Sequence, residues 1–438
     1  MLSNKNQASN PSICLVKDTI ILKDGETYIV YSPFTNLISR VKNYPISNNE
    51  IYRILQTKGF FSNVPSITKR DDGWQGFHSL TLLITRKCNL GCHYCYASAK
   101  PNGASMPLEL AIGALEWFVY QLVENKIRIT FHGGGEPTLE QVLIKSVAKR
   151  TDEIKDGRTT SYLITTNGTS DQKFIDWMIA NKFNISISMD GPPAIQDRNR
   201  PFVGGTPSST VVERNIRYLI SCSYPFTIRV TYSPTDDIIR VINYFGDLGV
   251  KKIHLEPLFP YGRDYEVVEF GKNSHYEVYS PVGGELVHKF IEAMDACKIY
   301  GIKIYNGHLA HFTKGIGYFC GAASGRAMMV GHDGLLTACI EVVDLADKDA
   351  DQFKLGEWIP HERRFDINID KLKILQSRHA DIIPECQTCF ARYTCAGGCS
   401  VKAVRATGNF LKCDIPYCSF TKALVAVLIK KIAAASGF

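Results

Sequence analysis

Hydrophobic and polar positions change period repeatedly along the middle of the chain. Between residues 80 and 305, short apolar runs of strand type are each followed by a longer run whose apolar residues have helical spacing. Such an alternation predicts a parallel sheet with its helices on the outside. The predicted strands cover residues 80–85, 127–132, 159–166, 185–189, 227–233 and 252–257.

Six of these strand and helix units are fewer than the eight of a complete (β/α)8 barrel. We therefore predict an α/β fold whose main domain, residues 80–305, is a partial (β/α)6 barrel. In folds of this kind the chemistry gathers at the carboxyl ends of the strands. The predicted helices cover residues 108–124, 139–156, 172–181, 210–222, 238–248 and 284–300.

The chain on either side of this region has a different pattern. Residues 14–41 alternate between apolar and polar around Asp24-Gly25, which predicts a hairpin, and Ser47 begins a short helix. We expect residues 1–79 to form a small α+β extension. Eight of the fourteen cysteines follow residue 305, and we expect residues 306–438 to form a separate Cys-rich domain.

Composition excludes several classes of protein. Hydrophobic residues make up 45% and charged residues 21% of the chain, which is typical of a globular protein. The net charge of +7 comes from Lys and Arg spread without a run, which argues against a nucleic-acid partner. Residues 1–10 lack a signal-peptide core, and the apolar stretch 423–429 is too short to span a bilayer. We expect a cytoplasmic protein without a membrane partner, whose reduced cysteines can bind metal.

Three cysteines follow the first predicted strand at C-x3-C-x2-C spacing: Cys88, Cys92 and Cys95. Thiolates are the usual ligands of iron–sulfur clusters, and three of them leave one iron of a four-iron cluster without a protein ligand. A small molecule could bind that iron. A structural zinc site is the alternative, but it needs four ligands, and the only local fourth candidate is His93, which lies between two of the cysteines.

The other predicted strands also end in polar or Gly-rich segments. Residues 132–137, His-Gly-Gly-Gly-Glu-Pro, follow the second strand. Glycines let the backbone approach a ligand closely, and the carboxylate of Glu136 can accept hydrogen bonds from an ammonium group. Residues 165–169 end the third strand and residues 186–191 the fourth. These segments predict one site at the edge of the sheet.

The cysteine spacing, with Tyr94 before the last cysteine, resembles the radical SAM superfamily. The resemblance implies that S-adenosylmethionine chelates the fourth iron of a [4Fe–4S] cluster and is cleaved reductively to a hydrogen-abstracting 5′-deoxyadenosyl radical. It also implies that the Gly-Gly-Glu-Pro motif contacts the amino group of the cofactor, and that a serine and an arginine meet its ribose or carboxylate. In this sequence the residues at these cofactor positions are Tyr94, Gly134, Gly135, Glu136, Ser188 and Arg200.

The C-terminal cysteines resemble the SPASM extension of radical SAM enzymes, which implies two auxiliary [4Fe–4S] clusters. Paired cysteines are also common in zinc sites, which remain the alternative from the residues alone. By the resemblance, the nearer cluster is held by Cys320, Cys339 and Cys399, and the farther one by Cys386, Cys389, Cys395 and Cys418. Cys413 is then either the fourth ligand of the nearer cluster or a free thiol.

SPASM proteins mostly modify peptides, and the N-terminal extension is similar to a reduced peptide-recognition element. We therefore predict an enzyme that forms a thioether or carbon–carbon crosslink in a precursor peptide and takes electrons from a flavodoxin or ferredoxin. An anaerobic sulfatase maturase is the first alternative. Such enzymes carry an Asp after the cysteine equivalent to Cys339, whereas this chain has Ile340 followed by Glu341. A zinc-stabilised binding protein is the alternative of another class.

Overall fold

The computed structural model describes residues 13–16, 19–35, 37–42, 53, 55–60, 76–258, 281–306, 318–321 and 323–436. Six parallel strands form the centre of its main sheet, and they confirm the predicted α/β class. The strands are β5 (Ser79–Leu83), β6 (Lys126–His132), β7 (Thr159–Thr166), β8 (Asn184–Ser188), β9 (Phe226–Tyr232) and β10 (Lys252–Pro257).

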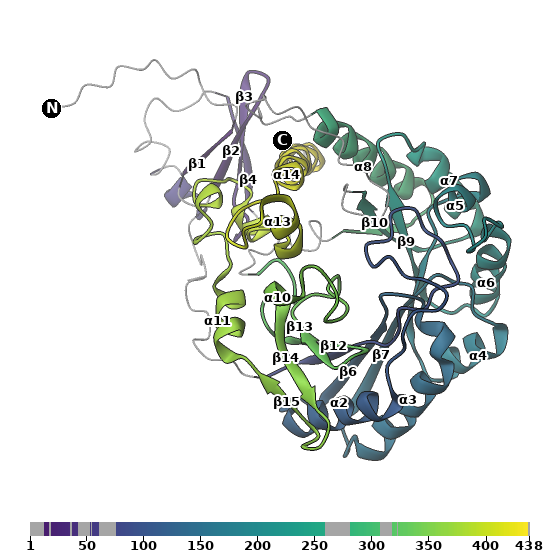
Figure 1. Ribbon diagram of the computed structural model, residues 1–438. Helices are drawn as coiled ribbons and strands as arrows, with labels where there is room; N and C mark the ends of the chain where they lie inside the picture. Colours follow the sequence, from purple (N-terminus) through teal and green to yellow (C-terminus); the bar gives the residue numbers. More distant parts are fainter. Residues whose placement is uncertain are drawn as a thin grey trace.

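Helices cover the outer, convex face of this sheet (Figure 1). Along β9, Ile228, Val230 and Tyr232 are buried, whereas Arg229 and Thr231 between them are only partly buried. Apolar residues therefore pack under the helices, and polar residues face the inside of the partial barrel. The outer elements are α2 (Leu108–Gln121), η1 (Pro137–Glu140), α3 (Gln141–Ile154), α4 (Gln172–Ala180), α5 (Pro193–Asn199), α6 (Ser209–Ser221), α7 (Ile238–Leu248) and α8 (Pro281–Ile299).

The main sheet continues past both ends of the six strands. β11 (Lys303–Tyr305) pairs in parallel with β10, and β12 (Ala327–Gly331) pairs in parallel with β5. Antiparallel strands β13 (Leu335–Thr337), β14 (Lys354–Ile359) and β15 (Arg364–Ile367) follow β12. The same sheet therefore contains strands from both sides of the domain boundary expected at residues 305–306. Its strands β12 to β15 place the Cys-rich region beside β5, the first strand of the barrel (Figure 1).

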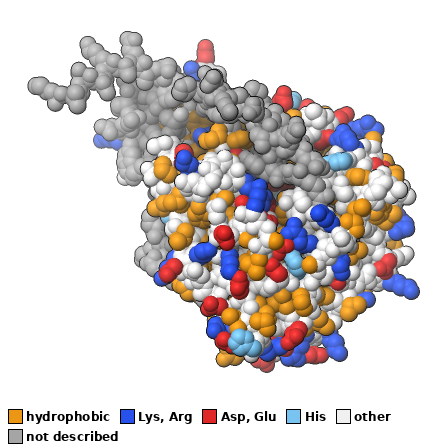
Figure 2. Space-filling model, in the orientation of Figure 1, with side chains coloured by type: hydrophobic (Ala, Val, Ile, Leu, Met, Phe, Trp, Pro, Cys, Tyr) orange, Lys and Arg blue, Asp and Glu red, His pale blue; other side chains and the backbone are white. Residues whose placement is uncertain are grey.

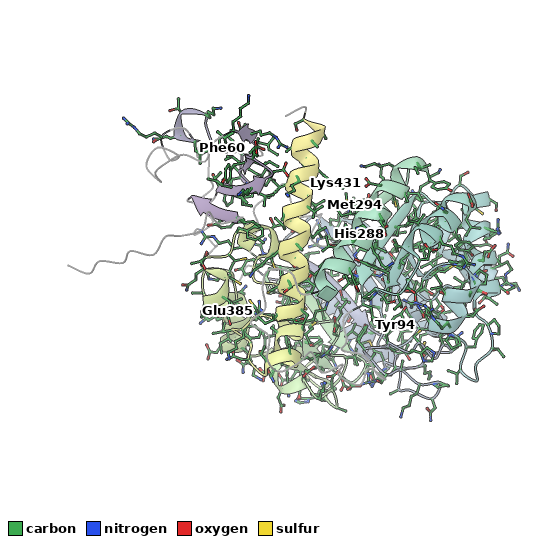
Figure 3. All side chains as sticks on the ribbon, turned by 90° about the horizontal axis from the view of Figure 1, so that it is seen from above. Phe60, Tyr94, His288, Met294, Glu385 and Lys431 are labelled. Carbon is green, nitrogen blue, oxygen red and sulfur yellow. The ribbon has the colours of Figure 1, made fainter. Side chains whose placement is uncertain are left out.

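Short helices and loops carry the C-terminal cysteines up to Cys413, and a long helix, which contains Cys418, ends the described chain. The long helix, α14 (Ile415–Ala435), contains the apolar stretch 423–429 and packs against α8, where Lys431 Nζ lies 2.7 Å from Asp295 Oδ2. Figure 3 shows α14 between the N-terminal strands and α8. The shorter elements are α10 (Ala350–Phe353), α11 (Ile369–Ser377), η2 (Pro384–Cys386), α12 (Arg392–Cys395) and α13 (Ser400–Thr407).

A separate antiparallel sheet forms the N-terminal part. Its strands are β1 (Ile13–Val16), β2 (Thr19–Asp24), β3 (Thr27–Tyr31) and β4 (Ile38–Val41). The predicted hairpin is confirmed, because β2 and β3 pair around Gly25, whose φ of 62° suits a tight turn. Leu55 and Phe60 pack on this sheet, but residues 43–52, where the predicted helix begins, lie outside the described residues.

Charged side chains of both signs are interspersed over the face shown in Figure 2. None of the helices among the described residues has the length and apolar content needed to cross a bilayer.

Candidate active site

The loop that carries Cys88, Cys92 and Cys95 lies at the carboxyl end of β5, and we call residues 84–107 the cluster loop. Its backbone is fastened to the segment after α5, since the Gly91 amide donates to the Pro201 carbonyl (2.8 Å) and the Val203 amide to the Asn89 carbonyl (2.9 Å). All three thiols line one cavity of about 310 Å³. The structure therefore brings the predicted cysteines together at the predicted edge of the sheet.

Burial makes the thiols of Cys88 and Cys92 poor anions without a cation beside them. Burial, aided by the charge of Glu136, raises the pKa of Cys88 to about 12. Burial also raises the pKa of Cys92, although the nearby Arg200 guanidinium opposes that rise. Metal ligation requires the thiolate, so the site suits a strongly cationic centre such as iron.

The Gly-rich turn after β6 packs directly on the cluster loop. The Gly135 amide donates to the Thr85 carbonyl (2.8 Å) and the Glu136 amide to the Lys87 carbonyl (2.7 Å). A Cβ atom at Gly135 would lie 2.0 Å from the Lys87 carbonyl oxygen. The sequence suggested that the glycines admit a ligand, but at Gly135 the close approach is made by the protein's own backbone. The glycine thereby fixes the turn against the cluster loop.

The carboxylate of Glu136 is buried, and one of its oxygens already accepts three hydrogen bonds from the protein. Its Oε1 accepts hydrogen bonds from the Thr138 amide (3.0 Å), the Thr138 hydroxyl (2.7 Å) and the Thr166 hydroxyl (2.6 Å). Its Oε2 accepts one, from the Asn167 amide (2.5 Å). Burial raises the pKa of Glu136, and these hydrogen bonds oppose that rise. Because a carboxylate oxygen has two lone pairs, Oε2 can still accept from an ammonium group in the cavity.

Tyr94 and Arg200 are joined through Asp190, a residue that sequence reasoning did not select. The Tyr94 hydroxyl donates to the Asp190 carboxylate, Arg200 Nε lies 3.1 Å from Asp190 Oδ1, and the Arg200 guanidinium lies over the Tyr94 ring at 5.0 Å. The Thr231 amide of β9 also donates to Asp190 Oδ1 (3.1 Å). Burial opposes the charge of Arg200, but Asp190 raises its pKa above the ordinary value. Asp190 thus ties the cluster loop, Arg200 and β9 together.

The wall of the cavity formed by β9 and β10 carries charged residues that the sequence analysis left out of its site. Arg229 pairs in register with Ser188 of β8 and His254 of β10, so the three side chains share the inner face. All three line the cavity, as does Glu256. Burial and the charge of Arg229 lower the pKa of His254 to about 4. The signal that could have identified these residues is the alternation of polar and apolar positions within each strand.

The Cys-rich region closes the same cavity. Ile340 and Glu341, just after Cys339, both line it. Glu341 is held in place by the Arg405 guanidinium, whose Nη1 lies 2.6 Å from Glu341 Oε2. Residues from the barrel and from the C-terminal region therefore form one chamber.

The eight C-terminal cysteines form two groups. We call Cys320, Cys339 and Cys399 the near group. Burial places the pKa of the Cys339 thiol well above its usual value, and the charges of Cys399 and Cys320 raise it further, so the three thiols lie close together. The far group is Cys386, Cys389, Cys395, Cys413 and Cys418. Cys413 Sγ lies 3.3 Å from Cys386 Sγ, so the structure places Cys413 in the far group and not beside Cys339.

No set of three or more His, Cys, Asp or Glu side chains in the described part of the chain is grouped to hold a single metal ion. A structural zinc site would bring four ligands to within about 2.0–2.3 Å of one ion.

The chain is similar in sequence to several known proteins. The sequence profile of the radical SAM superfamily matches residues 82–243. An uncharacterized protein of Methanocaldococcus jannaschii is 30% identical over 205 residues, which cover 45% of this chain and 70% of the relative. The serine-type anaerobic sulfatase-maturating enzyme of Klebsiella aerogenes is 24% identical over 80% of this chain and 85% of its own.

Two solved structures share the fold. Native anSMEcpe with bound AdoMet has a TM-score of 0.65 at 20% identity, over 82% of this chain and 100% of its own. SuiB of Streptococcus suis bound to S-adenosylmethionine has a TM-score of 0.53 at 14% identity, over 91% and 98%. The chain belongs to the radical SAM superfamily. It is an enzyme of that superfamily, with S-adenosylmethionine and a [4Fe–4S] cluster as its cofactors.

Proposed function

We propose that the protein is a peptide maturase that crosslinks a precursor peptide within the chamber formed by the cluster loop and the Cys-rich region. The observation that carries the proposal is this chamber, in which the three thiols of the cluster loop face Arg229, Glu256 and Glu341. SuiB has been solved with its precursor peptide SuiA, and anSMEcpe with a Cp18Cys peptide. These relatives support a peptide as the substrate of this chain.

The residues of the chain fit the cofactors of the superfamily. Cys88, Cys92 and Cys95 would hold the [4Fe–4S] cluster, and Glu136 Oε2 would accept from the amino group of S-adenosylmethionine. Ser188 and Arg200 would contact its carboxylate or ribose. When bound and reduced by one electron, this cofactor pair supplies hydrogen-atom abstraction.

The remaining walls of the chamber would position the peptide. Arg229 and His254 can donate hydrogen bonds to carbonyl oxygens or a carboxylate of the substrate, and Glu256 can accept them. Glu256 is itself positioned from both sides, since Asn306 Nδ2 lies 3.3 Å away and Lys402 Nζ of α13 lies 3.8 Å away. The chamber would hold the target carbon near the cofactor, and a bound peptide would displace water from it.

The near and far groups would hold two auxiliary clusters that accept the electron released when the crosslink forms. A flavodoxin or ferredoxin in the reducing cytoplasm would supply the electron that starts the reaction.

Formylglycine formation in a sulfatase is a second candidate, and Glu341 favours it. The absence of an Asp directly after Cys339 argued against this activity, because the oxidation needs a proton acceptor. The structure places the carboxylate of Glu341, one residue later, in the wall of the chamber. A carboxylate is therefore present in the chamber, although at a shifted position.

The test uses the full chain, purified and reconstituted with iron and sulfide under anaerobic conditions. It is incubated with S-adenosylmethionine, a reductant and either short peptides encoded beside its gene or Ser- and Cys-containing sulfatase peptides. Tandem mass spectrometry separates the outcomes, because a crosslink blocks fragmentation between the joined residues and formylglycine reacts with an aldehyde reagent. Cleavage of S-adenosylmethionine with modification of neither peptide type would refute both activities.

A further inference from the structure

The far group contains one thiol more than a four-iron cluster needs. Cys386, Cys413 and Cys418 pack together against Ala380 and Ile383, and Cys386 Sγ and Cys413 Sγ are 3.3 Å apart. Cys413 is also among the neighbours whose charge raises the pKa of Cys389 and Cys395, although burial is the larger cause. Five thiols thus surround one volume, whereas each of four irons binds one thiolate.

Buried Arg378 explains why Cys413 lies there. Its Nη1 donates to the carbonyls of Gly397 (2.8 Å) and Gly398 (3.2 Å), which precede Cys399. Its Nε donates to the Phe410 carbonyl (2.7 Å) and its Nη2 to the Lys412 carbonyl (3.0 Å), just before Cys413. One guanidinium therefore fastens the segment that ends in Cys413 to the loop that follows Cys395.

The near group has three thiols among the described residues. Of the cysteines outside the cluster loop and the C-terminal region, Cys222 is exposed at the end of α6, and Cys297 is buried in the core on α8. Neither belongs to the chamber wall. The side chain of Cys14, in β1, lies outside the described part of the structure. With Cys413 held beside Cys386, the near group gains no fourth thiol from the described part of the chain.

We propose that Cys413 and Cys418 are alternative ligands of one iron in the far cluster, and that the near cluster is held by Cys320, Cys339 and Cys399 alone. The inference rests on the proposed function, because it assumes that both groups bind four-iron clusters. Cys386, Cys389 and Cys395 would take three irons of the far cluster, and whichever of the two remaining thiols is not bound would stay free. One iron of the near cluster would then be open to a ligand other than a cysteine of this chain.

The first test is iron and sulfide analysis of the reconstituted full-length protein and its variants. We expect Cys413→Ala and Cys418→Ala each to retain about twelve irons, as for three four-iron clusters, and the double variant to lose about four. Cys222→Ala is the matched control and should retain all of them. A loss of about four irons in either single variant would overturn the inference, because one thiol would then be indispensable.

The second test needs no variant. The loaded wild-type protein is treated with iodoacetamide under anaerobic conditions, and the alkylated cysteines are mapped by mass spectrometry. We expect alkylation at one of Cys413 and Cys418 in each molecule, with the other six C-terminal thiols protected. Protection of both Cys413 and Cys418 in the same molecule would overturn the inference while leaving the proposed function intact. Absence of iron from the wild-type protein would overturn both.

Discussion

Asp190→Asn is the substitution that tests the organisation of the cofactor site most sharply. Asp190 is buried and accepts from Tyr94, Thr231 and Asn199, and it is paired with Arg200, whose side chain is also largely buried. The substitution keeps the shape and removes the charge. Breaking a buried ion pair costs about 3–5 kcal/mol, and the amide retains part of the hydrogen bonding, so we expect a loss of stability at the lower end of that range.

The effect on the cofactor follows from the position of Arg200. Without its carboxylate partner, the guanidinium is no longer fixed beside Cys92 and the Tyr94 ring. A hydrogen bond to a charged group contributes about 1.5–3 kcal/mol, which corresponds to a roughly tenfold to hundredfold loss of affinity. Equilibrium binding of S-adenosylmethionine to the reconstituted enzyme measures this loss, and thermal unfolding measures the change in stability.

Asp152→Asn is the matched control for this experiment. Asp152 pairs with Lys155 at 2.8 Å on the surface of α3, where both side chains are exposed. Exposed pairs contribute about 0–1 kcal/mol, so neither stability nor affinity should change measurably. If Asp190→Asn left the affinity for S-adenosylmethionine within about twofold of wild type, Asp190 would not position the cofactor site and the reasoning would be wrong.

Three further predictions follow from the chamber and its walls. Gly135→Ala should reduce the amount of iron bound by the cluster loop, because the added Cβ would lie 2.0 Å from a carbonyl oxygen of that loop. Gly284→Ala is the control and should retain the iron, because the space around its Cβ is open. Iron analysis compares the two variants. Arg229→Gln should leave the affinity for S-adenosylmethionine within about twofold but abolish peptide modification, and a large loss of cofactor affinity would move Arg229 to the cofactor site. Burial lowers the pKa of His132 and His254 from 6.5 to about 4, so their contribution to stability is present above pH 6.5 and is lost as the pH falls toward 4. Replacing both histidines with Gln should flatten this part of the stability profile in chemical unfolding, and an unchanged slope would contradict the assignment.

The barrel could be predicted from the sequence because its strands and helices have distinct local periods. The pairing of β12 with β5 could not, since it joins residues more than two hundred positions apart and leaves no local signal. The contact made by Gly135 could not be predicted either. A glycine in this turn indicated that some group approaches the backbone closely, but only the fold shows that this group is the Lys87 carbonyl.

Some residues of the candidate site could likewise be predicted from local sequence, and others could not. Cys88, Cys92 and Cys95 were identified by their spacing, which local sequence determines. His254 and Glu256 alternate with buried Ile253 and Leu255, and this pattern marked the inner face without showing that a cavity lies there. The position of Cys413 depends on Arg378, which lies thirty-five residues earlier and whose guanidinium donates to backbone carbonyls. Contacts of this kind are set by packing and not by spacing.

The central claim is that the cluster loop forms the site of S-adenosylmethionine cleavage and that the C-terminal groups hold separate clusters. The most direct measurement compares wild type with the variant in which Cys88, Cys92 and Cys95 are all replaced by Ala, after anaerobic reconstitution. Wild type should contain about twelve irons and release 5′-deoxyadenosine on reduction, and the variant should retain about eight irons and release none. Release of 5′-deoxyadenosine by the variant, or zinc in place of iron in the wild-type protein, would contradict the account.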